Sequence, residues 1–233
     1  MIEETNTGSY FKGLSKRDYI LKTQEIIRNE GREAASIRRI AKEMNCSSAS
    51  LYRYFDSQME LIYYAELGQL TGYIHRLNEA QKNWKNVWDR YVGIWDCYSR
   101  EAFRKPDVYD LLFLRSEVEH LKTSMEEYYE MFPEAMQETN EVFTSMLKQK
   151  RFFARDMEIC KQCVQDGALE ETDAPLLNRL SCTLYEGYFK TILDNPLTDE
   201  KEVDAKVEQY IADLDWIVMH IAKDLKGYRG YGK

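Results

Sequence analysis

Side chains that bind phosphate groups are concentrated between residues 47 and 54. This stretch consists of Ser47, Ser48, Ala49, Ser50, Leu51, Tyr52, Arg53 and Tyr54. Hydroxyls and phenols donate hydrogen bonds to phosphate oxygens, and an arginine reaches a phosphate or a base edge. Small residues such as Ala49 let the backbone come close to the floor of a groove. The stretch is therefore a candidate for contact with a nucleic acid. The alternative is that Tyr52 and Tyr54 pack between helices.

Cysteine and histidine lack the spacing of a metal site or a catalytic site. The five cysteines, an odd number, suit free thiols in a reducing compartment. Cys160 and Cys163 have C-x-x-C spacing, but the sequence has no second such pair and the motif falls inside a helical stretch. His75, His120 and His220 are scattered, and the sequence has no catalytic or nucleotide-binding fingerprint. The sequence predicts a protein that is not an enzyme and has no cofactor and no metal.

Three helices are expected to position the phosphate-binding stretch. Ser15 and Asp18 form a capping box that begins the first helix, and Gly31 ends it. Ser36 caps a short second helix, and a third helix is predicted over residues 48–55. Two short helices joined by a tight turn, after a longer supporting helix, make a helix-turn-helix unit.

Four short motifs stand at the spacing of one DNA-binding domain: residues 36–41 (SIRRIA), 45–47 (NCS), 51–55 (LYRYF) and 57–61 (SQMEL). Over about residues 13 to 65 the chain resembles the DNA-binding head of the tetracycline-repressor (TetR) family. Asn45 stands where a glycine is usual, Gln58 where a phosphate-binding lysine is common, and Lys22 where a small apolar residue is usual. Asn45 tolerates the left-handed backbone of a tight turn. Gln58 donates to a phosphate but carries no charge.

The resemblance implies a role for individual residues of this head. The implied backbone contacts are Ser36, Arg38, Arg39, Tyr52, Tyr54 and Gln58. The implied base contacts are Ser48, Ser50 and Arg53, flanked by Ser47 and Ala49. The resemblance also implies a homodimer that binds double-stranded DNA, and a helical body that binds a small-molecule effector.

Charge is unevenly distributed along the chain. The net charge of −8 argues against a nucleic-acid partner only if that charge is evenly spread. Residues 9–55 carry ten basic and five acidic side chains, a net charge of +5, which leaves −13 for the rest. This asymmetry indicates a basic head that meets a polyanion and an acidic body that is repelled by it. The alternative is that these are ordinary charged helix faces.

Composition predicts an all-helical chain with a small head and a larger body. The 233 residues include only 11 glycines and 4 prolines, with 44% hydrophobic and 31% charged residues. This composition argues against a sandwich, a barrel or a disordered protein. No apolar run reaches membrane-spanning length and the polar start is no export signal, so we expect a cytoplasmic bacterial protein. We expect a mobile arm over residues 1–12, the head over 13–60, the body over 61–225 and a mobile tail over 226–233.

One helix of the body carries a continuous aromatic stripe. Trp84, Trp88, Tyr91, Trp95 and Tyr98 recur at spacings of 4, 3, 4 and 3 residues. The stripe predicts a core helix, or a helix whose bulky rings leave gaps for a flat or apolar ligand. The candidates for a ligand pocket are Trp88, Tyr91, Trp95, Tyr98, Phe113, His120 and Tyr185.

The last two long helices predict a dimer interface. Apolar residues of the final helix recur at near-heptad spacing, which suits packing against a partner helix. Either both helices bury these faces within one chain, or they pair across a two-fold axis as a four-helix bundle. The interface candidates are Leu180, Leu184, Gly187, Tyr188, Ile211, Leu214, Val218 and Ile221.

These features together predict a ligand-responsive transcription regulator, and more specifically a repressor. It would bind a pseudo-palindromic operator as a homodimer and be released by a small hydrophobic or aromatic ligand. The alternative is a helical small-molecule-binding or interaction protein whose head no longer reads DNA specifically. The uncharged Gln58 and the modest charge of the head favour this alternative.

Overall fold

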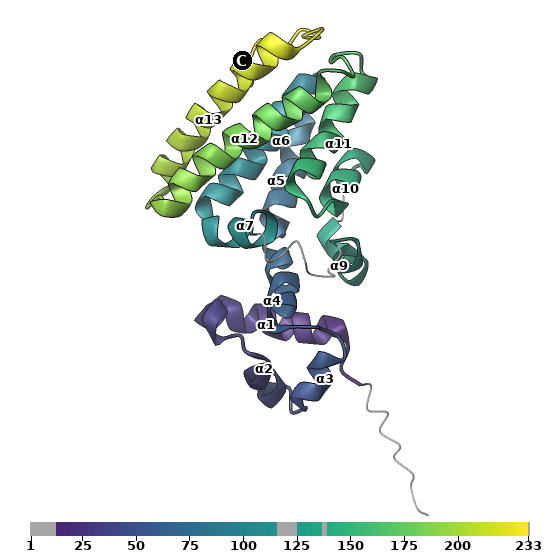
Figure 1. Cartoon of the computed structure of the whole chain (residues 1–233), viewed down its shortest axis with the longest axis vertical. Helices are drawn as coiled ribbons and strands as arrows, with labels where there is room; N and C mark the ends of the chain where they lie inside the picture. Colours follow the sequence, from purple (N-terminus) through teal and green to yellow (C-terminus); the bar gives the residue numbers. More distant parts are fainter. Residues whose placement is uncertain (1–12, 116–124, 137–138, 233) are drawn as a thin grey trace, which may run out of the picture. The chain divides into compact units, whose positions relative to one another are not determined.

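The structure is a computed structural model that describes residues 13–115, 125–136 and 139–232 (Figure 1). Within these ranges the chain forms α-helices joined by 3-10 turns and loops, without a strand, which confirms the predicted all-helical fold. The chain divides into two compact units, residues 1–65 and 66–233. In the described part of the chain, no helix is long and apolar enough to cross a membrane.

The N-terminal unit is built from the first four helices. They are α1 (Lys16–Glu30), α2 (Ile37–Glu43), α3 (Ser48–Tyr52) and α4 (Gln58–Leu67), with a 3-10 turn over Arg32–Ala34. The predicted capping box begins α1, because the Ser15 hydroxyl accepts from the Asp18 N–H and the Asp18 carboxylate accepts from the Ser15 N–H. Gly31 ends α1 at a φ of 87°, a backbone conformation that suits glycine.

The turn between α2 and α3 has the backbone that the sequence predicts. Asn45 has a φ of 51°, in the left-handed region that Asn tolerates better than most residues. The Cys46 N–H then donates to the Ala41 carbonyl at 2.9 Å and closes the turn. The third helix is shorter than predicted, because the chain leaves α3 after Tyr52 and turns so that Phe55 becomes buried. The Phe55 ring lies 6.5 Å from the Tyr19 ring and 6.2 Å from the Tyr64 ring.

The second unit is a larger bundle. Its helices are α5 (Thr71–Ala80), α6 (Val87–Arg104), α7 (Pro106–Phe113), α9 (Met125–Met131), α10 (Glu141–Lys148), α11 (Phe152–Gln165), α12 (Ala174–Asp194) and α13 (Glu200–Ile221). The bundle surrounds α6, which packs against α5, α7, α11, α12 and α13 (Figure 1). The side chains of Trp88, Tyr91, Trp95 and Tyr98 are all buried, so the aromatic stripe forms the core of this unit.

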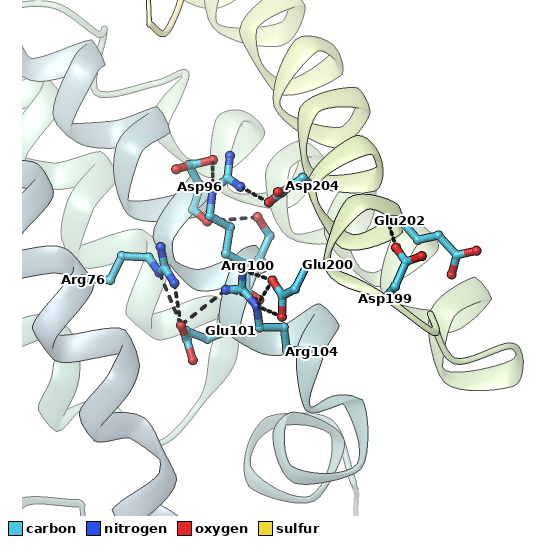
Figure 2. A network of polar contacts seen from close by, with 10 residues as sticks. Arg76, Asp96, Arg100, Glu101, Arg104, Asp199, Glu200, Glu202 and Asp204 are labelled. Atoms are coloured by element: carbon cyan, nitrogen blue, oxygen red, sulfur yellow. Dashed lines mark hydrogen bonds and ion pairs between the residues drawn. The ribbon is translucent and has the colours of Figure 1, made fainter.

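Ion pairs hold the N-terminal half of α13 against α6 (Figure 2). The Arg100 guanidinium of α6 donates to Asp204 at 2.5 Å, and Arg104 forms an ion pair with Glu200. The apolar face of α13 lies against α6 and α12, and Leu214 and Val218 are fully buried. Three of the four α13 residues predicted for the dimer interface, Ile211, Leu214 and Val218, are therefore buried within this chain, whereas Ile221 is half-buried.

The C-terminal segment after residue 225, for which a mobile tail is predicted, makes specific contacts with the bundle. Tyr228 is buried, and its hydroxyl donates to the Asp215 carboxylate. The Tyr231 N–H donates to the same carboxylate at 3.0 Å. Just before this segment, the Trp88 indole N–H donates to the Asp224 carbonyl at 2.9 Å. Phenol and indole donors thus attach the end of the chain to the bundle.

Gly93 lies where α6 meets the Trp84 ring. A β-carbon at this position would lie 2.4 Å from Trp84 Cε2, far inside van der Waals contact. We predict that Gly93→Ala lowers the free energy of unfolding by about 1–3 kcal/mol, because overpacking outweighs the roughly 1 kcal/mol that Ala contributes in a helix. Urea denaturation measures the change.

The Trp84→Ala background is the control for this prediction. In that background the obstructing ring is gone, and Gly93→Ala should stabilise the chain through helix propensity alone. A loss of stability that is equal in both backgrounds would contradict the Gly93–Trp84 contact.

Candidate nucleic-acid interface and ligand cavity

The polar side of α3 faces solvent, whereas Leu51 is fully buried. The Tyr52 side chain is 56% exposed, and Arg53 and Ala49 are also exposed. Ser48 and Ser50 are half-buried, and the Ser50 hydroxyl lies 3.1 Å from the hydroxyl of the exposed Ser47. One surface therefore presents hydroxyls, a phenol and a guanidinium together.

The Tyr54 hydroxyl is used within the N-terminal unit. It donates to the Leu14 carbonyl at 3.1 Å, and its ring lies 5.7 Å from the Tyr19 ring. Tyr54 is 37% exposed, so its ring edge remains accessible. The alternative that tyrosines pack between helices thus holds in part for Tyr54 and does not hold for Tyr52. Gln58 is exposed at the first position of α4.

The residues predicted on α2 differ in how available they are. The Ser36 hydroxyl caps the helix by accepting from the Arg39 N–H at 3.3 Å, and Arg38 is exposed. The Arg39 guanidinium donates to Glu30 at 2.6 Å and to Glu43 at 2.9 Å. These bonds hold the pKa of the Glu30 carboxyl below its ordinary value. A phosphate at Arg39 must therefore compete with two carboxylates.

A cavity of about 30 Å³ lies inside the second unit, along the aromatic stripe. Tyr91, Trp95 and Tyr98, all predicted as pocket residues, line it together with Tyr73 of α5 and Phe152 of α11. A cavity of this size holds one water molecule, so the stripe packs as a core and also leaves a gap.

The other predicted pocket residues lie elsewhere. Trp88 is buried against the C-terminal segment, as described above. Tyr185 is buried behind the cavity, with its ring 5.0 Å from the Phe152 ring. Phe113 lines a neighbouring outer pocket of about 240 Å³. His120 lies outside the residues that the structure describes.

Two charged residues of α11 line the cavity, and sequence reasoning missed both. Asp156 accepts from the Trp95 indole N–H and from the Asn178 amide, each at 2.9 Å. Burial is the largest effect on this carboxyl and raises its pKa to about 6. Arg155 Nη1 donates to the Leu147 and Gln149 carbonyls at 3.2 and 3.3 Å.

The signal for these residues was their helical phase. Phe152, Arg155 and Ile159 recur at i, i+3 and i+7, so Arg155 shares the apolar face of α11. A charged residue in an apolar stripe is either paired inside the protein or functional. If charged residues of the body are assumed to face solvent, both Arg155 and Asp156 are overlooked.

The thiols and histidines form no recognisable reactive site in the described residues. Cys160 and Cys163 are buried on α11, and burial raises the pKa of the Cys163 thiol to about 12. Such a thiol is a poor nucleophile. His75 and His220 are exposed on separate helices. Within the described ranges, no group of three or more His, Cys, Asp or Glu residues could hold a metal ion.

The fold and the exposed surface of α3 define a class: a helix-turn-helix DNA-binding domain followed by a larger helical domain. Residues 22–64 match the sequence model of the bacterial regulatory proteins of the tetR family. This match, which covers the DNA-binding domain alone, confirms the resemblance of that domain to the TetR family seen in the sequence. Because the family is one of regulatory proteins, the prediction of a regulator and not an enzyme is also confirmed.

Solved structures similar to this chain are distant in sequence. A protein of unknown function from Rhodococcus sp. RHA1 has 15% identity and a TM-score of 0.54, covering 92% of this chain and 100% of its own. A protein from Shewanella sp. PV-4 assigned to the tetR family has 15% identity, a TM-score of 0.49 and coverages of 90% and 99%. PfmR, a TetR family transcriptional regulator from Thermus thermophilus, has 17% identity, a TM-score of 0.43 and coverages of 83% and 97%. No curated protein matches the chain in sequence.

The Asp156 carboxyl makes the free energy of unfolding depend on pH, and the substitution Asp156→Asn removes this dependence. Its folded-state pKa of about 6 exceeds the ordinary value of 3.8, so the folded chain binds the proton more tightly and loses stability as pH rises through this window. From pH 4 to pH 7 we predict that the free energy of unfolding of Asp156→Asn rises by about 2 kcal/mol relative to that of the unsubstituted chain. Urea denaturation at both pH values measures this difference.

Glu158→Gln is the matched control, because Glu158 is a carboxylate on the same helix whose pKa is lowered by its bonds to Lys161 and Ser145. Its folded-state stabilisation is present above the unfolded pKa and is lost as pH falls. Between pH 4 and pH 7 the free energy of unfolding of Glu158→Gln should therefore fall relative to that of the unsubstituted chain, which is opposite to the change predicted for Asp156→Asn. A pH-independent effect of Asp156→Asn would show that this carboxyl does not titrate as described.

Proposed function

We propose that this protein is a transcriptional repressor that binds a pseudo-palindromic operator as a homodimer and is released by a small aromatic ligand. The observation that carries the proposal is the solvent-facing polar side of α3, with Tyr52 56% exposed and Arg53 beside it. We assign DNA binding to residues 13–60, and ligand binding and dimerisation to residues 61–225. A repressor of this kind acts in the cytoplasm of a bacterium.

In the proposed complex, α3 lies in the major groove of the operator. Ser48, Ser50 and Arg53 contact base edges, because a short helix that enters a groove reads bases with its exposed side. Tyr52, Ser36 and Arg38 bind phosphates on either side, and the uncharged Gln58 adds a weaker contact. Arg39 contributes only if a phosphate replaces its carboxylate partners.

An exposed apolar face on α12 and α13 supports the proposed homodimer. Trp216 is 64% exposed, and Leu180, Leu176 and Met219 are each exposed by 37% to 40%. The exposed Gly187 and the half-buried Leu184, Tyr188 and Ile221 complete the set of accessible predicted residues. These side chains lie on two helices that pack against each other, and exposed large apolar side chains on neighbouring elements are typical of a protein interface. In this proposal Trp216 and Met219 take the place of the buried Leu214 and Val218.

The ligand would act by favouring a body shape in which the two DNA-binding heads no longer match the operator. A shift of the population from 1:99 to 99:1 requires a differential affinity of about 10⁴-fold. The cavity lies on α5 and α6, and α5 is separated from α4 in sequence only by the 3-10 turn Gly68–Leu70. A change at the cavity thus has a short covalent route towards the head.

A second candidate function keeps the helical body but gives the head no specific DNA target. The ion pairs of Arg39 and the neutral Gln58 favour it, since both reduce the charge offered to phosphates. A titration of the chain with its own upstream intergenic DNA, over a range of salt concentrations, separates the two. The repressor binds this DNA specifically, whereas the second candidate binds all sequences weakly and alike.

We predict that Arg53→Ala weakens operator binding by about 1–3 kcal/mol and that Tyr52→Ala weakens it by about 1 kcal/mol. Both substitutions remove exposed donors, so the fold should be unaffected. Fluorescence anisotropy with labelled operator measures the change. Lys82→Ala, which removes an exposed cation from the second unit, is the control and should leave binding unchanged. Unaltered affinity in both α3 variants would contradict the proposed interface.

We predict that Trp216→Ala raises the dimer dissociation constant roughly 30-fold or more, as expected for an aromatic hot spot. Sedimentation equilibrium measures the constant. The control is Leu21→Ala, which removes another exposed apolar side chain, 43% exposed on α1. If both variants associate like the unsubstituted chain, the dimer uses a different surface.

A further inference from the structure

We infer that the cavity beside α6 receives the carboxylate of a planar aromatic acid, with Arg155 as its anion-binding residue. This inference rests on the proposed function, because it names the chemical class of the effector. Aromatic rings line much of the cavity, which suits a flat apolar ligand, and the Arg155 guanidinium and phenol hydroxyls suit an anionic end. The Asp156 carboxylate also lines the cavity, but it is bonded to Trp95 and Asn178.

Arg155 is a buried cation without an anionic partner among the described residues. Arg155 is only 4% exposed, and its Nη1 atom donates to neutral carbonyl oxygens. Nη2 has no hydrogen-bond partner in the part of the chain that the structure describes. The neighbouring Asp156 is directed to Trp95 and Asn178 and forms no ion pair with Arg155. A buried, incompletely bonded charge is costly, and an anion that enters the cavity would relieve that cost.

Phenol hydroxyls next to Arg155 add further donors. The Tyr98 hydroxyl is buried and has no partner. The Tyr73 hydroxyl lies 3.8 Å from the Met146 sulfur and also interacts with the Arg155 side chain. Both tyrosines line the cavity with Arg155. A carboxylate accepts about four hydrogen bonds, so it can use the guanidinium and both phenols at once.

The walls of the cavity suit the ring of such an acid. The Trp95 ring lies 5.6 Å from the Phe152 ring, and the Tyr98 ring lies 5.7 Å from it, so the three rings pack against one another and a ligand ring would take the place of Phe152. The Arg155 guanidinium itself lies 4.8 Å above the Phe113 ring. A bound aromatic ring would extend this set of edge and face contacts.

The volume required for the ring comes from the outer pocket. The cavity of about 30 Å³ is too small for an aromatic acid, but Phe152 also lines the outer pocket of about 240 Å³. Because Phe152 is shared by both spaces, a movement of this side chain is the route by which the inferred ligand would gain room. The outer pocket carries Arg115, Lys150 and Arg151 against Glu186. Arg115 is held by the Asp110 carboxylate at 2.6 Å, so the cation that we expect to attract an anion at this mouth is the exposed Arg151.

The competing explanation is that Arg155 is purely structural. A single water molecule in the cavity would then bind Nη2 and the Tyr98 hydroxyl, while Nη1 holds the carbonyls at the end of α10. A structural arginine of this kind gives no preference for an anionic ligand.

Benzoate, benzamide and benzylammonium are probes that share one ring and differ in charge. We would titrate each into the full-length chain without DNA, into the millimolar range, and follow tryptophan fluorescence and calorimetric heat. We expect benzoate to bind at least about tenfold more tightly than benzamide, since hydrogen bonds to charged groups are the stronger ones. Benzylammonium should bind more weakly than both. Equal binding of benzoate and benzamide, or no binding of benzoate, would overturn the inference.

Substitutions then locate the anion site. Arg155→Met should reduce the affinity for benzoate by about tenfold or more and leave that for benzamide unchanged. Arg155→Lys keeps the charge and should retain part of the preference. Lys161→Met, which removes a surface cation from the same helix, should change neither affinity. An anion preference that survives in Arg155→Met would place the site elsewhere. If Arg155→Met does not fold, the Arg155→Lys variant and the comparison of probes decide the question.

These titrations contain no DNA, so their outcome is independent of the proposed repressor activity. A chain that prefers benzoate but binds no operator would keep the anion site and lose the repressor. A chain that binds operator but does not distinguish benzoate from benzamide would keep the repressor and lose the anion site.

Discussion

The second unit depends on the burial of one aromatic face of α6. Trp95 and Tyr98 contact rings from α7, α11, α12 and α13, including Tyr109 at 5.2 Å and Tyr210 at 6.0 Å. Bulky rings fill most of the space, but their hydroxyls are polar and four of them here, on Tyr98, Tyr109, Tyr185 and Tyr210, are buried without a partner. Each such group costs about 1–3 kcal/mol unless a water or ligand reaches it. Of these four residues, Tyr98 lines the cavity, so the packing that forms the core also leaves one such donor beside it.

In the N-terminal unit, polar groups are kept exposed on a very short helix. α3 has five residues and cannot be stable by itself. It is held by Leu51 and Phe55, which are buried, and by the left-handed turn at Asn45. The same anchoring leaves Tyr52 and Arg53 on the open side. Segregation of charge between a basic head and an acidic remainder then directs a polyanion to this unit.

Local signals in the sequence predicted much of the fold. Capping residues such as Ser15 and the turn at Asn45 act within a few positions, so their effect can be predicted from neighbours alone. Periodicity predicted that one face of α13 is buried, but periodicity does not identify what covers it, and Leu214 packs within the chain. Arg155 was missed because its surroundings come from segments far apart in sequence. Tyr73, Tyr98 and Met146 of the cavity likewise meet only in the folded unit.

The most direct measurement is a hydroxyl-radical footprint of the full-length chain on the intergenic DNA upstream of its own gene. We expect two protected half-sites related by a two-fold axis, with centres about 34–36 Å apart along the duplex. Protection should be lost steeply as salt rises, because the contacts to phosphate release counterions. A single protected site would contradict the homodimer. Uniform weak protection that does not depend on sequence would contradict the assignment of this chain as a DNA-reading regulator.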